Sequence, residues 1–488
     1  MGPKVLTLHD LIAALAGGLP TPGAVPHVEI RDAVIDSRLA GPGCLFIALR
    51  GEQHDGHDFV PQAIAQGAVA IIAERPLDPA LCQVLDLRTP SADVAHLEPD
   101  RPVCLVTTNS LAGLQQAAAY WRRQHTVSTV GITGSIGKTT SKEMIAALLR
   151  QRYRTLKSEG NYNNEIGLPL TLLRLTGEHQ QVVLEMGMYD LGEIAHLAAI
   201  AQPRIGVVTN VGPTHLERLG TIERIAQAKA ELPQALPTAE EGGVAILNAD
   251  DERVRAMAAL TQARIFTYGL QPGADLWADD IESYGLEGLR FHVHYRDQTL
   301  HVKIPLLGRH SVHTALTAAA VALVEGLSWE EIVTGLHDQS VQLRLIAVPG
   351  PGGSTILDDT YNASPASSIA ALNLLAELPG RKLAVLGDMY ELGHYAAEGH
   401  RLVGRRARDV VDLLITVGPL GQIIGLEARD AGMPAAAVQH VETNAEAVTL
   451  LRTLSQPGDI ILVKGSRGTK MDQIVADLAN SHTPRGNP

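Results

Sequence analysis

The stretch "GITGSIGKTTSKEM" (131–144) joins a strand pattern to a helix pattern and decides how the middle of this chain folds. Before the turn, "VSTVGIT" (127–133) is an apolar run of the kind that forms a buried strand. After the turn, "KTTSKEMIAALL" (138–149) places apolar side chains on one face of a helix. A glycine-rich turn between a strand and a helix directs backbone N–H groups at a phosphate. We therefore predict a phosphate-binding loop between the two elements.

The loop departs from the strict pattern G-x-x-x-x-G-K-[ST] at one position. Gly137, Lys138 and Thr139 fit the pattern, whereas Ile132 replaces its first glycine and Gly134 follows two residues later. In such loops the lysine reaches the terminal phosphates of a nucleotide and the hydroxyl binds Mg²⁺. We expect these roles for Lys138 and Thr139. The alternative is a glycine-rich turn that carries a surface lysine.

Length, charge and cysteine content narrow the class of protein. The 488 residues are enough for three domains, at roughly 100–200 residues each. A net charge of −13 argues against nucleic acid as a partner, because nucleic acid is bound by clustered Lys and Arg. The three cysteines have neither disulfide-framework nor metal-ligand spacing, which favours a reducing cytoplasm. Residues 1–20 do not have the form of a signal peptide, and no apolar run is long enough for membrane insertion.

Alternating strand and helix patterns predict an α/β fold of three domains. We expect a small N-terminal α/β domain over residues 1–102, a central ATPase domain with a mostly parallel sheet over 103–338, and a Rossmann-like C-terminal domain over 339–488. Residues 276–305 differ, because their alternation of apolar and polar side chains predicts antiparallel strands.

Several polar residues follow or interrupt apolar patterns in ways that suggest a site. Glu185 ends the run "VVLEM", where a carboxylate facing the phosphate loop would hold Mg²⁺, although a strand-end glutamate facing solvent is the alternative. Lys229 shares a helix face with Ile222 and Ile225, so it is either buried or extends its amine to solvent. Asn163 and Asn164 are amides that orient a phosphate or, equally, form a turn.

Motifs in a fixed order along nearly the whole chain resemble one family. They include "DSRLAGPGCLFIALRGEQHDGHDF" (36–59), "TGSIGKT" (133–139), "EGNYNNEIGLPLTLL" (159–173), "TNVGPTHLERLGTIERIAQAKAEL" (209–232), "LDDTYNASP" (357–365), "GDMYELG" (387–393) and "LVKGSRG" (462–468). This set resembles the Mur ligases, the ATP-dependent amino-acid ligases of peptidoglycan synthesis. The resemblance implies a cytoplasmic enzyme that activates a carboxylate as an acyl phosphate and joins it to an amine.

Within that family the motifs are most similar to those of the branch that joins D-alanyl-D-alanine to UDP-N-acetylmuramoyl-tripeptide. The resemblance therefore implies these two partners, ATP and two Mg²⁺ ions as cofactors, and a monomer. The third residue of the tripeptide, lysine or diaminopimelate, stays open.

The resemblance also implies a role for each matching residue. The catalytic set is Lys138, Glu185, His215 and Lys229, and Lys229 stands at the position where Mur ligases carry a carbamylated lysine; a lowered pKa, which burial favours, would permit that modification. The metal ligands are Thr139, Glu185 and His215. The nucleotide-binding set is Thr133, Gly134, Ser135, Ile136, Gly137, Lys138, Thr139, Asn164, Arg344 and Asp359. The substrate-binding set is Ser37, Arg38, Asp55, His57, Asn362, Lys464, Ser466 and Arg467.

One position differs from the family pattern, and other functions stay in competition. The family often has an adenine-contacting asparagine where this chain has Thr314, whose hydroxyl cannot supply both a donor and an acceptor in amide geometry.

The alternative functions are another Mur-family ligase or a non-catalytic, nucleotide-dependent binding protein. The "DNPR" stretch of the diamino-acid-adding branch and the N-K-x-D motif of switch GTPases do not occur.

Overall fold

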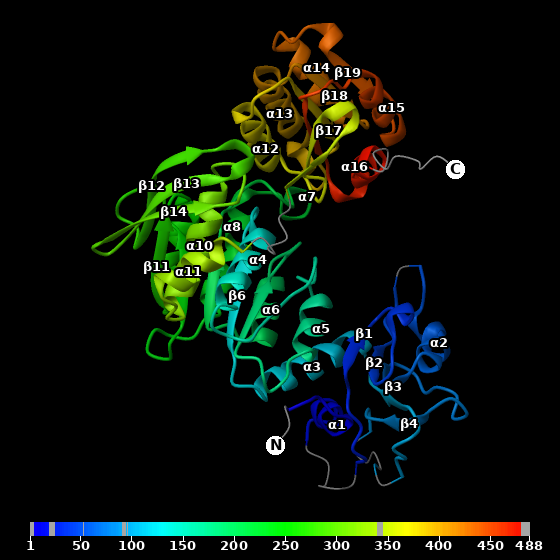
Figure 1. Cartoon of the computed structure of the whole chain (residues 1–488). Coiled ribbons are helices and arrows are strands. Elements are labelled where there is room, and N and C mark those ends of the chain that lie inside the picture. The colour runs from blue at the N-terminus through cyan, green and yellow to red at the C-terminus, as the bar shows by residue number, and fades with distance from the viewer. Residues whose placement is uncertain are drawn as a thin grey trace, which may run out of the picture.

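A computed structural model describes residues 4–18, 25–51, 53–89, 94, 96–338 and 345–479. These residues form three sheets that follow one another along the chain, each covered by helices (Figure 1). The predicted α/β fold in three parts is confirmed. Among the described residues no helix is long and apolar enough to span a membrane.

The N-terminal sheet has the strand order β1-β2-β3-β5-β4, and all of its pairings are parallel. Its strands are β1 (Asp32–Val34), β2 (Cys44–Ile47), β3 (Ala68–Ala73), β4 (Gln83–Asp86) and β5 (Val103–Val106), and its helices are α1 (Leu8–Ala16) and α2 (Val60–Ala65). The predicted boundary after residue 102 separates β5 from the sheet to which it belongs. A boundary that keeps this sheet intact falls after Val106, before α3 (Ser110–Arg123), and both boundaries remain predictions.

The central sheet has the order β14-β13-β12-β11-β10-β9-β6-β8-β7. Its pairings are parallel from β7 to β12 and antiparallel between β12, β13 and β14, as the alternation over 276–305 predicted. The strands are β6 (Ser128–Thr133), β7 (Thr155–Lys157), β8 (Gln181–Glu185), β9 (Ile205–Val208), β10 (Val244–Asn248), β11 (Arg264–Gly269), β12 (Leu276–Ser283), β13 (Leu289–Tyr295) and β14 (Gln298–Ile304).

Helices cover both faces of the central sheet, because successive residues of its parallel strands point to opposite cores. Val183 of β8 packs in one core with α4 (Lys138–Leu149) and α10 (Ser311–Val324). Val182 and Leu184 pack in the other core with α6 (Glu193–Ala201) and α8 (Ile222–Gln234). The remaining helices of this part are α5 (Gly167–Leu173), α7 (Leu216–Leu219), α9 (Glu252–Ala256) and α11 (Trp329–Leu336).

The C-terminal sheet has the order β15-β16-β20-β17-β18-β19, with only the β15–β16 pairing antiparallel among its described strands. The strands are β15 (Ile346–Pro349), β16 (Thr355–Asp358), β17 (Lys382–Gly387), β18 (Leu413–Val417), β19 (Val438–Val441) and β20 (Ile460–Lys464). The helices are α12 (Pro365–Glu377), α13 (Ala396–Val410), α14 (Gly421–Asp430), α15 (Asn444–Leu454) and α16 (Asp472–Ala479). In Figure 1, α7 of the central part lies directly below this part of the chain.

Candidate active site

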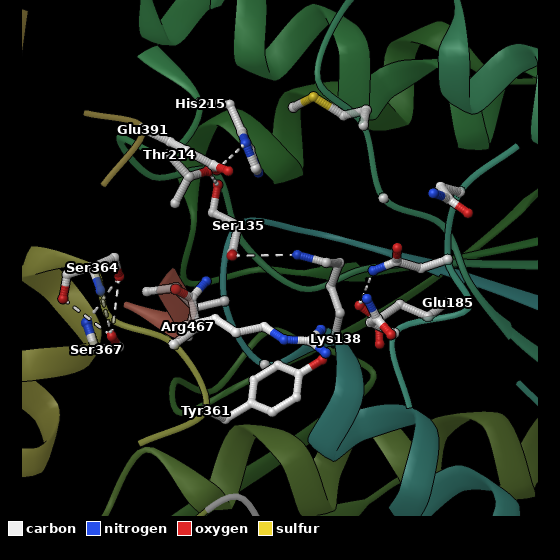
Figure 2. Close-up of a pocket in the computed structure, with 18 of the residues that line it drawn as sticks. Ser135, Lys138, Glu185, Thr214, His215, Tyr361, Ser364, Ser367, Glu391 and Arg467 are labelled. Carbon is white, nitrogen blue, oxygen red and sulfur yellow. Dashed lines mark hydrogen bonds and ion pairs between the residues drawn. The ribbon is translucent and has the colours of Figure 1, made fainter. Parts of the chain in front are cut away.

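A cavity of about 760 Å³ lies between the central and C-terminal parts of the chain. Its walls are loops that follow the strands β6, β8 and β9 on one side and β16, β17 and β20 on the other. Ligands of open α/β sheets bind outside the carboxyl ends of the strands. Two such edges therefore face one space, and Figure 2 shows Lys138 from the central part beside Tyr361 and Arg467 from the C-terminal part.

The phosphate loop has the strand–turn–helix form that its sequence predicted. Gly134 has φ +151° and Gly137 has φ +84°, the conformations for which glycine is suited. A Cβ on Gly134 would lie 1.9 Å from Thr209 Oγ1, so no other residue fits there without movement. Helix α4 begins at Lys138 with no side chain capping it, which leaves its first N–H groups directed at the cavity.

The loop after β9 holds the phosphate loop in place. Asn210 Oδ1 accepts a hydrogen bond from Ile136 N at 2.9 Å, and Asn210 Nδ2 donates to Ile136 O at 2.9 Å. The hydroxyl of Ser135 accepts from Gly212 N at 2.8 Å. Lys138 Nζ lies 2.8 Å from Gly134 O, so the lysine curves back over its own loop. Asn210 was not among the predicted site residues, because an asparagine after a strand is common in ordinary turns.

Glu185 is the centre of an oxygen-rich cluster beside the loop. It ends β8, is 2% exposed, and its Oε2 accepts a hydrogen bond from Thr139 Oγ1 at 2.6 Å. Its Oε1 accepts from Asn163 Nδ2 at 2.9 Å. Asn164, which we expected to bind nucleotide, lines the cavity and accepts from Gly167 N at 2.9 Å, so its side chain also forms the turn before α5. Glu185 therefore faces the phosphate loop and contacts it through Thr139, and its role as a Mg²⁺ ligand stays a prediction.

Of the predicted catalytic residues Lys229 and His215, only His215 is among the described residues that line the cavity. Lys229 is 2% exposed within α8, and burial lowers its pKa well below the usual value, with the charge of Lys138 acting in the same direction. The structure therefore favours burial over extension to solvent. His215 lines the cavity and begins α7 with φ +57°.

On the C-terminal side, Lys464 connects two of the predicted residues. It is 2% exposed, and its Nζ lies 2.7 Å from Asp359 Oδ2 and 2.9 Å from Asn362 O. Ser466 is buried and accepts a hydrogen bond from Tyr390 N at 2.9 Å. These side chains fix the loops after β16 and β20 against each other.

Arg467 is exposed and its guanidinium lies over the ring of Tyr361, 5.8 Å from the centroid. Tyr361 was not predicted, although it stands in the motif "LDDTYNASP". An aromatic face holds a guanidinium in a fixed orientation while leaving its N–H groups available. The pair suits the binding of an anionic group.

One end of the cavity is lined by residues from the start of α10. Ser311 and Thr314 line it together with Leu307 and His310. Burial lowers the pKa of His310 to about 4, so its ring is neutral near pH 7. A neutral imidazole carries its donor and its acceptor on two separate nitrogens, whereas those of Thr314 share one hydroxyl oxygen. His310 had no recognisable signal in the sequence.

The predicted residues of the N-terminal part lie apart from this cavity. Neither Ser37 and Arg38 nor Asp55 and His57 are among the described residues that line it. His57 is buried, and its Nδ1 lies 2.6 Å from Asp55 Oδ1 while its Nε2 accepts from Glu74 N at 2.9 Å. Both ring nitrogens are thus used within the protein, so His57 shapes the loop rather than offering a free group.

Arg38 extends into solvent, with Nη2 at 2.6 Å from Asp36 Oδ2, whereas Ser37 is buried and donates to Gln62. Arg344, which we expected to contact phosphate, lies outside the described residues. The substrate contacts of the N-terminal part and the role of Arg344 stay predictions.

Comparison with protein families places all three parts of the chain in one group. Residues 29–98 match the Mur ligase family, catalytic domain; residues 132–322 match the Mur ligase middle domain; residues 343–467 match the Mur ligase, glutamate ligase domain. A protein of Mycobacterium tuberculosis named UDP-N-acetylmuramoyl-tripeptide–D-alanyl-D-alanine ligase is 38% identical over 96% of this chain and 97% of its own length. The chain belongs to the Mur ligase family.

Solved structures are similar over the same length. MurF from Acinetobacter baumannii superposes with a TM-score of 0.82 and 31% identity, covering 98% of this chain and 99% of that one. MurF ligase from Thermotoga maritima, solved in complex with ADP, gives a TM-score of 0.76 at 29% identity, covering 91% of this chain and 96% of that one.

Proposed function

We propose that this protein is an ATP-dependent ligase that joins D-alanyl-D-alanine to UDP-N-acetylmuramoyl-tripeptide in peptidoglycan precursor synthesis. The observation that carries the proposal is the single cavity in which the phosphate loop, with Lys138 and Glu185, faces the Asp359–Lys464 loops and Arg467. One wall is suited to a nucleotide and the other to anionic and amide groups. The full-length similarity to ligases with that name supports the choice of substrates.

The reaction that fits this cavity has two steps. The terminal carboxylate of the tripeptide attacks the γ-phosphorus of ATP, which forms an acyl phosphate and releases ADP. The amine of the dipeptide then attacks the acyl carbon, phosphate leaves, and the amine loses a proton. Lys138 and the N–H groups at the start of α4 reduce the repulsion between the anionic carboxylate and the anionic phosphate. Enclosure between the two walls excludes water, which would hydrolyse the acyl phosphate.

The residues around Glu185 fit Mg²⁺. The Thr139 hydroxyl and the Glu185 carboxylate are oxygen ligands in contact with each other, the type that Mg²⁺ prefers. Among the described residues no three His, Cys, Asp or Glu side chains converge on one point, but Mg²⁺ at a nucleotide needs only one or two carboxylates beside the phosphates. When bound, Mg²⁺ would neutralise developing charge on the transferred phosphoryl group. We place a first ion at Thr139 and Glu185 and a second at His215.

We propose that Lys229 is carbamylated in the active protein. The modification requires a neutral amine, and burial supplies one by lowering the pKa of Lys229. The product is an anionic, carboxylate-like group, which would offset the charge of Lys138. We further propose that Ser37, Arg38 and the loop at Asp55 hold the UDP moiety, and that the protein acts as a monomer in the cytoplasm.

The test is phosphate release from ATP and Mg²⁺ with UDP-N-acetylmuramoyl-tripeptide, with the dipeptide added or omitted. We expect release that depends on D-alanyl-D-alanine and a UDP product whose mass increases by one dipeptide minus water. Release with another amino acid in place of the dipeptide would identify a different Mur ligase. ATP turnover that is indifferent to every acceptor would contradict the proposal.

A further inference from the structure

A close contact between a histidine and a glutamate joins the central and C-terminal parts of the chain at the cavity. His215 Nδ1 lies 2.8 Å from Glu391 Oε2, and both residues line the cavity (Figure 2). The ring nitrogen does not meet the geometry of a linear hydrogen bond, so the two groups are in close polar contact. Glu391 stands in the motif "GDMYELG", for which the sequence indicated no role.

The backbone conformations of His215 and Glu391 are unusual, and they fix the directions of the two side chains. His215 has φ +57° and Glu391 has φ +64°, a region that residues other than glycine rarely adopt. Such conformations persist only where the surrounding structure enforces them, and they are concentrated at functional sites. The two segments also touch through their backbones, since a Cβ on Gly393 would lie 2.8 Å from Glu217 Cα.

Two further side chains restrict the pair. The ring of Tyr189 meets the His215 ring edge-on, at 5.4 Å between centroids and 87° between planes. The guanidinium of Arg218 lies over the Tyr189 ring, 5.1 Å from its centroid. His215 is thus held on two sides, by the Glu391 carboxylate and by the Tyr189 ring.

We propose that Glu391 is a positioning residue that the C-terminal part supplies to His215 across the interface. With Nδ1 engaged by the carboxylate, Nε2 is the nitrogen left to bind a ligand. A carboxylate on one ring nitrogen fixes the tautomer and raises the basicity of the other, as in the carboxylate–histidine pairs that support metal ligands. Docking of the C-terminal part would thus complete the site at His215. The inference rests on the proposed function, since it takes His215 as the ligand of the second ion.

The test compares Glu391→Gln with Glu398→Gln in the full-length protein. Glu398 is a matched control, because it lies on α13, pairs with Arg405 and is not among the residues that line the cavity. Mn²⁺ binding is measured by electron paramagnetic resonance with ADP present and no turnover, and the Mg²⁺ concentration for half-maximal phosphate release is measured separately. Of the two Mn²⁺ sites, we expect Glu391→Gln to lower the affinity of the one that binds less tightly. We expect it also to raise the Mg²⁺ concentration for half-maximal phosphate release, each effect being about 10- to 100-fold. Glu398→Gln should match the wild type.

Two additional measurements separate positioning from a purely structural role. Glu391→Gln should keep the melting temperature of the wild type within about 2 °C, and Glu391→Asp, which retains the charge, should recover part of the Mn²⁺ affinity. Mn²⁺ affinity and Mg²⁺ requirement within twofold of an active wild type would overturn the role of Glu391. A wild type with no ligase activity would instead overturn the proposed function, and the Mn²⁺ titration would still report on the His215–Glu391 pair.

Discussion

Gly134 shows at the scale of a single residue why the phosphate loop tolerates its departure from the strict pattern. Ile132 is fully buried within β6 and pairs with Glu185 and Val207, so a glycine there would remove core packing. The close backbone approach falls at Gly134 instead, against Thr209. Glycine is required where the chain turns, and in this protein the turn begins two residues later than in the strict pattern.

Gly134→Ala should therefore disable the loop. The added Cβ meets Thr209 Oγ1, and the positive φ is unfavourable for alanine, so the loop must shift. We expect ADP affinity to fall at least about tenfold and the protein to lose roughly 1–3 kcal/mol of stability. Isothermal calorimetry and thermal unfolding measure the two effects. Gly41→Ala, where a Cβ meets no atom within 4 Å, is the control and should change neither.

Lys229→Met should be more stable than the wild type near neutral pH, in buffer free of bicarbonate. The unfolded chain protonates this lysine below a pH of about 10.4, whereas the folded chain leaves it neutral down to its lowered pKa. The unfolded state thus binds the extra proton, and wild-type stability falls as the pH drops from about 10.5 toward 7. Melting temperatures across that range should diverge toward low pH, with ligase activity lost in the variant. Parallel curves would show that Lys229 is charged in the folded protein.

At the scale of secondary structure elements, the loop after β9 supports the phosphate loop through hydrogen bonds that are present without a ligand. Asn210 satisfies both the N–H and the C=O of Ile136, and Ser135 is bonded to Gly212. The strands β6 and β9 are adjacent and parallel, so the two loops leave the sheet at the same edge. Neighbouring strands therefore hold the phosphate-binding N–H groups at fixed positions.

Asn210→Ala should loosen this arrangement. The substitution removes the acceptor of Ile136 N, and because this bond is only partly buried the loss costs about 0.5–1.5 kcal/mol. We expect weaker ADP binding of similar size and faster amide hydrogen exchange over 134–137. Asn373→Ala, which removes an exposed contact to Arg406, is the control. Unchanged exchange in the loop would mean that Asn210 does not support it.

At this scale, some residues of the candidate site can be predicted from the sequence and others cannot. Strand-end residues such as Glu185 were predictable, because the carboxyl ends of parallel strands meet at one edge. The sequence could not show which of Asn163 and Asn164 belongs to the site, because both residues suit a turn. Only the fold shows that Asn163 contacts Glu185. Glu391 acquires His215 as its partner through docking of the C-terminal part, and Tyr361 acquires Arg467 through the pairing of β16 with β20, and no local pattern encodes either contact. His57 illustrates the reverse, a motif residue whose ring is used within the fold.

At the scale of the whole molecule, the site exists only where two separately folded sheets meet. The central part supplies the phosphate loop and the C-terminal part supplies Lys464, Arg467 and Glu391. In Figure 1 the strands β1 to β4 of the N-terminal part lie apart from the C-terminal part, and neither Ser37 nor Arg38 is among the described residues that line the cavity. Substrate must therefore reach from one part to the others, and its binding should draw them together.

Small-angle X-ray scattering tests this closure. We expect the radius of gyration to decrease when a non-hydrolysable ATP analogue and UDP-N-acetylmuramoyl-tripeptide are both bound, because the two ligands together would add contacts that reach from the N-terminal part to the walls of the cavity. Either ligand alone should give a smaller decrease. An unchanged radius with both ligands bound would show that the parts are already docked in the free protein.

The most direct test of the central claim follows oxygen atoms through the reaction. UDP-N-acetylmuramoyl-tripeptide whose terminal carboxylate carries ¹⁸O at both positions is turned over with ATP, Mg²⁺ and D-alanyl-D-alanine. If the carboxylate attacks the γ-phosphorus, one ¹⁸O of each carboxylate leaves in the released phosphate and the other stays in the new amide, as mass spectrometry would show. Phosphate without ¹⁸O, released in step with amide formation, would contradict an acyl phosphate intermediate and the division of roles between the two walls of the cavity.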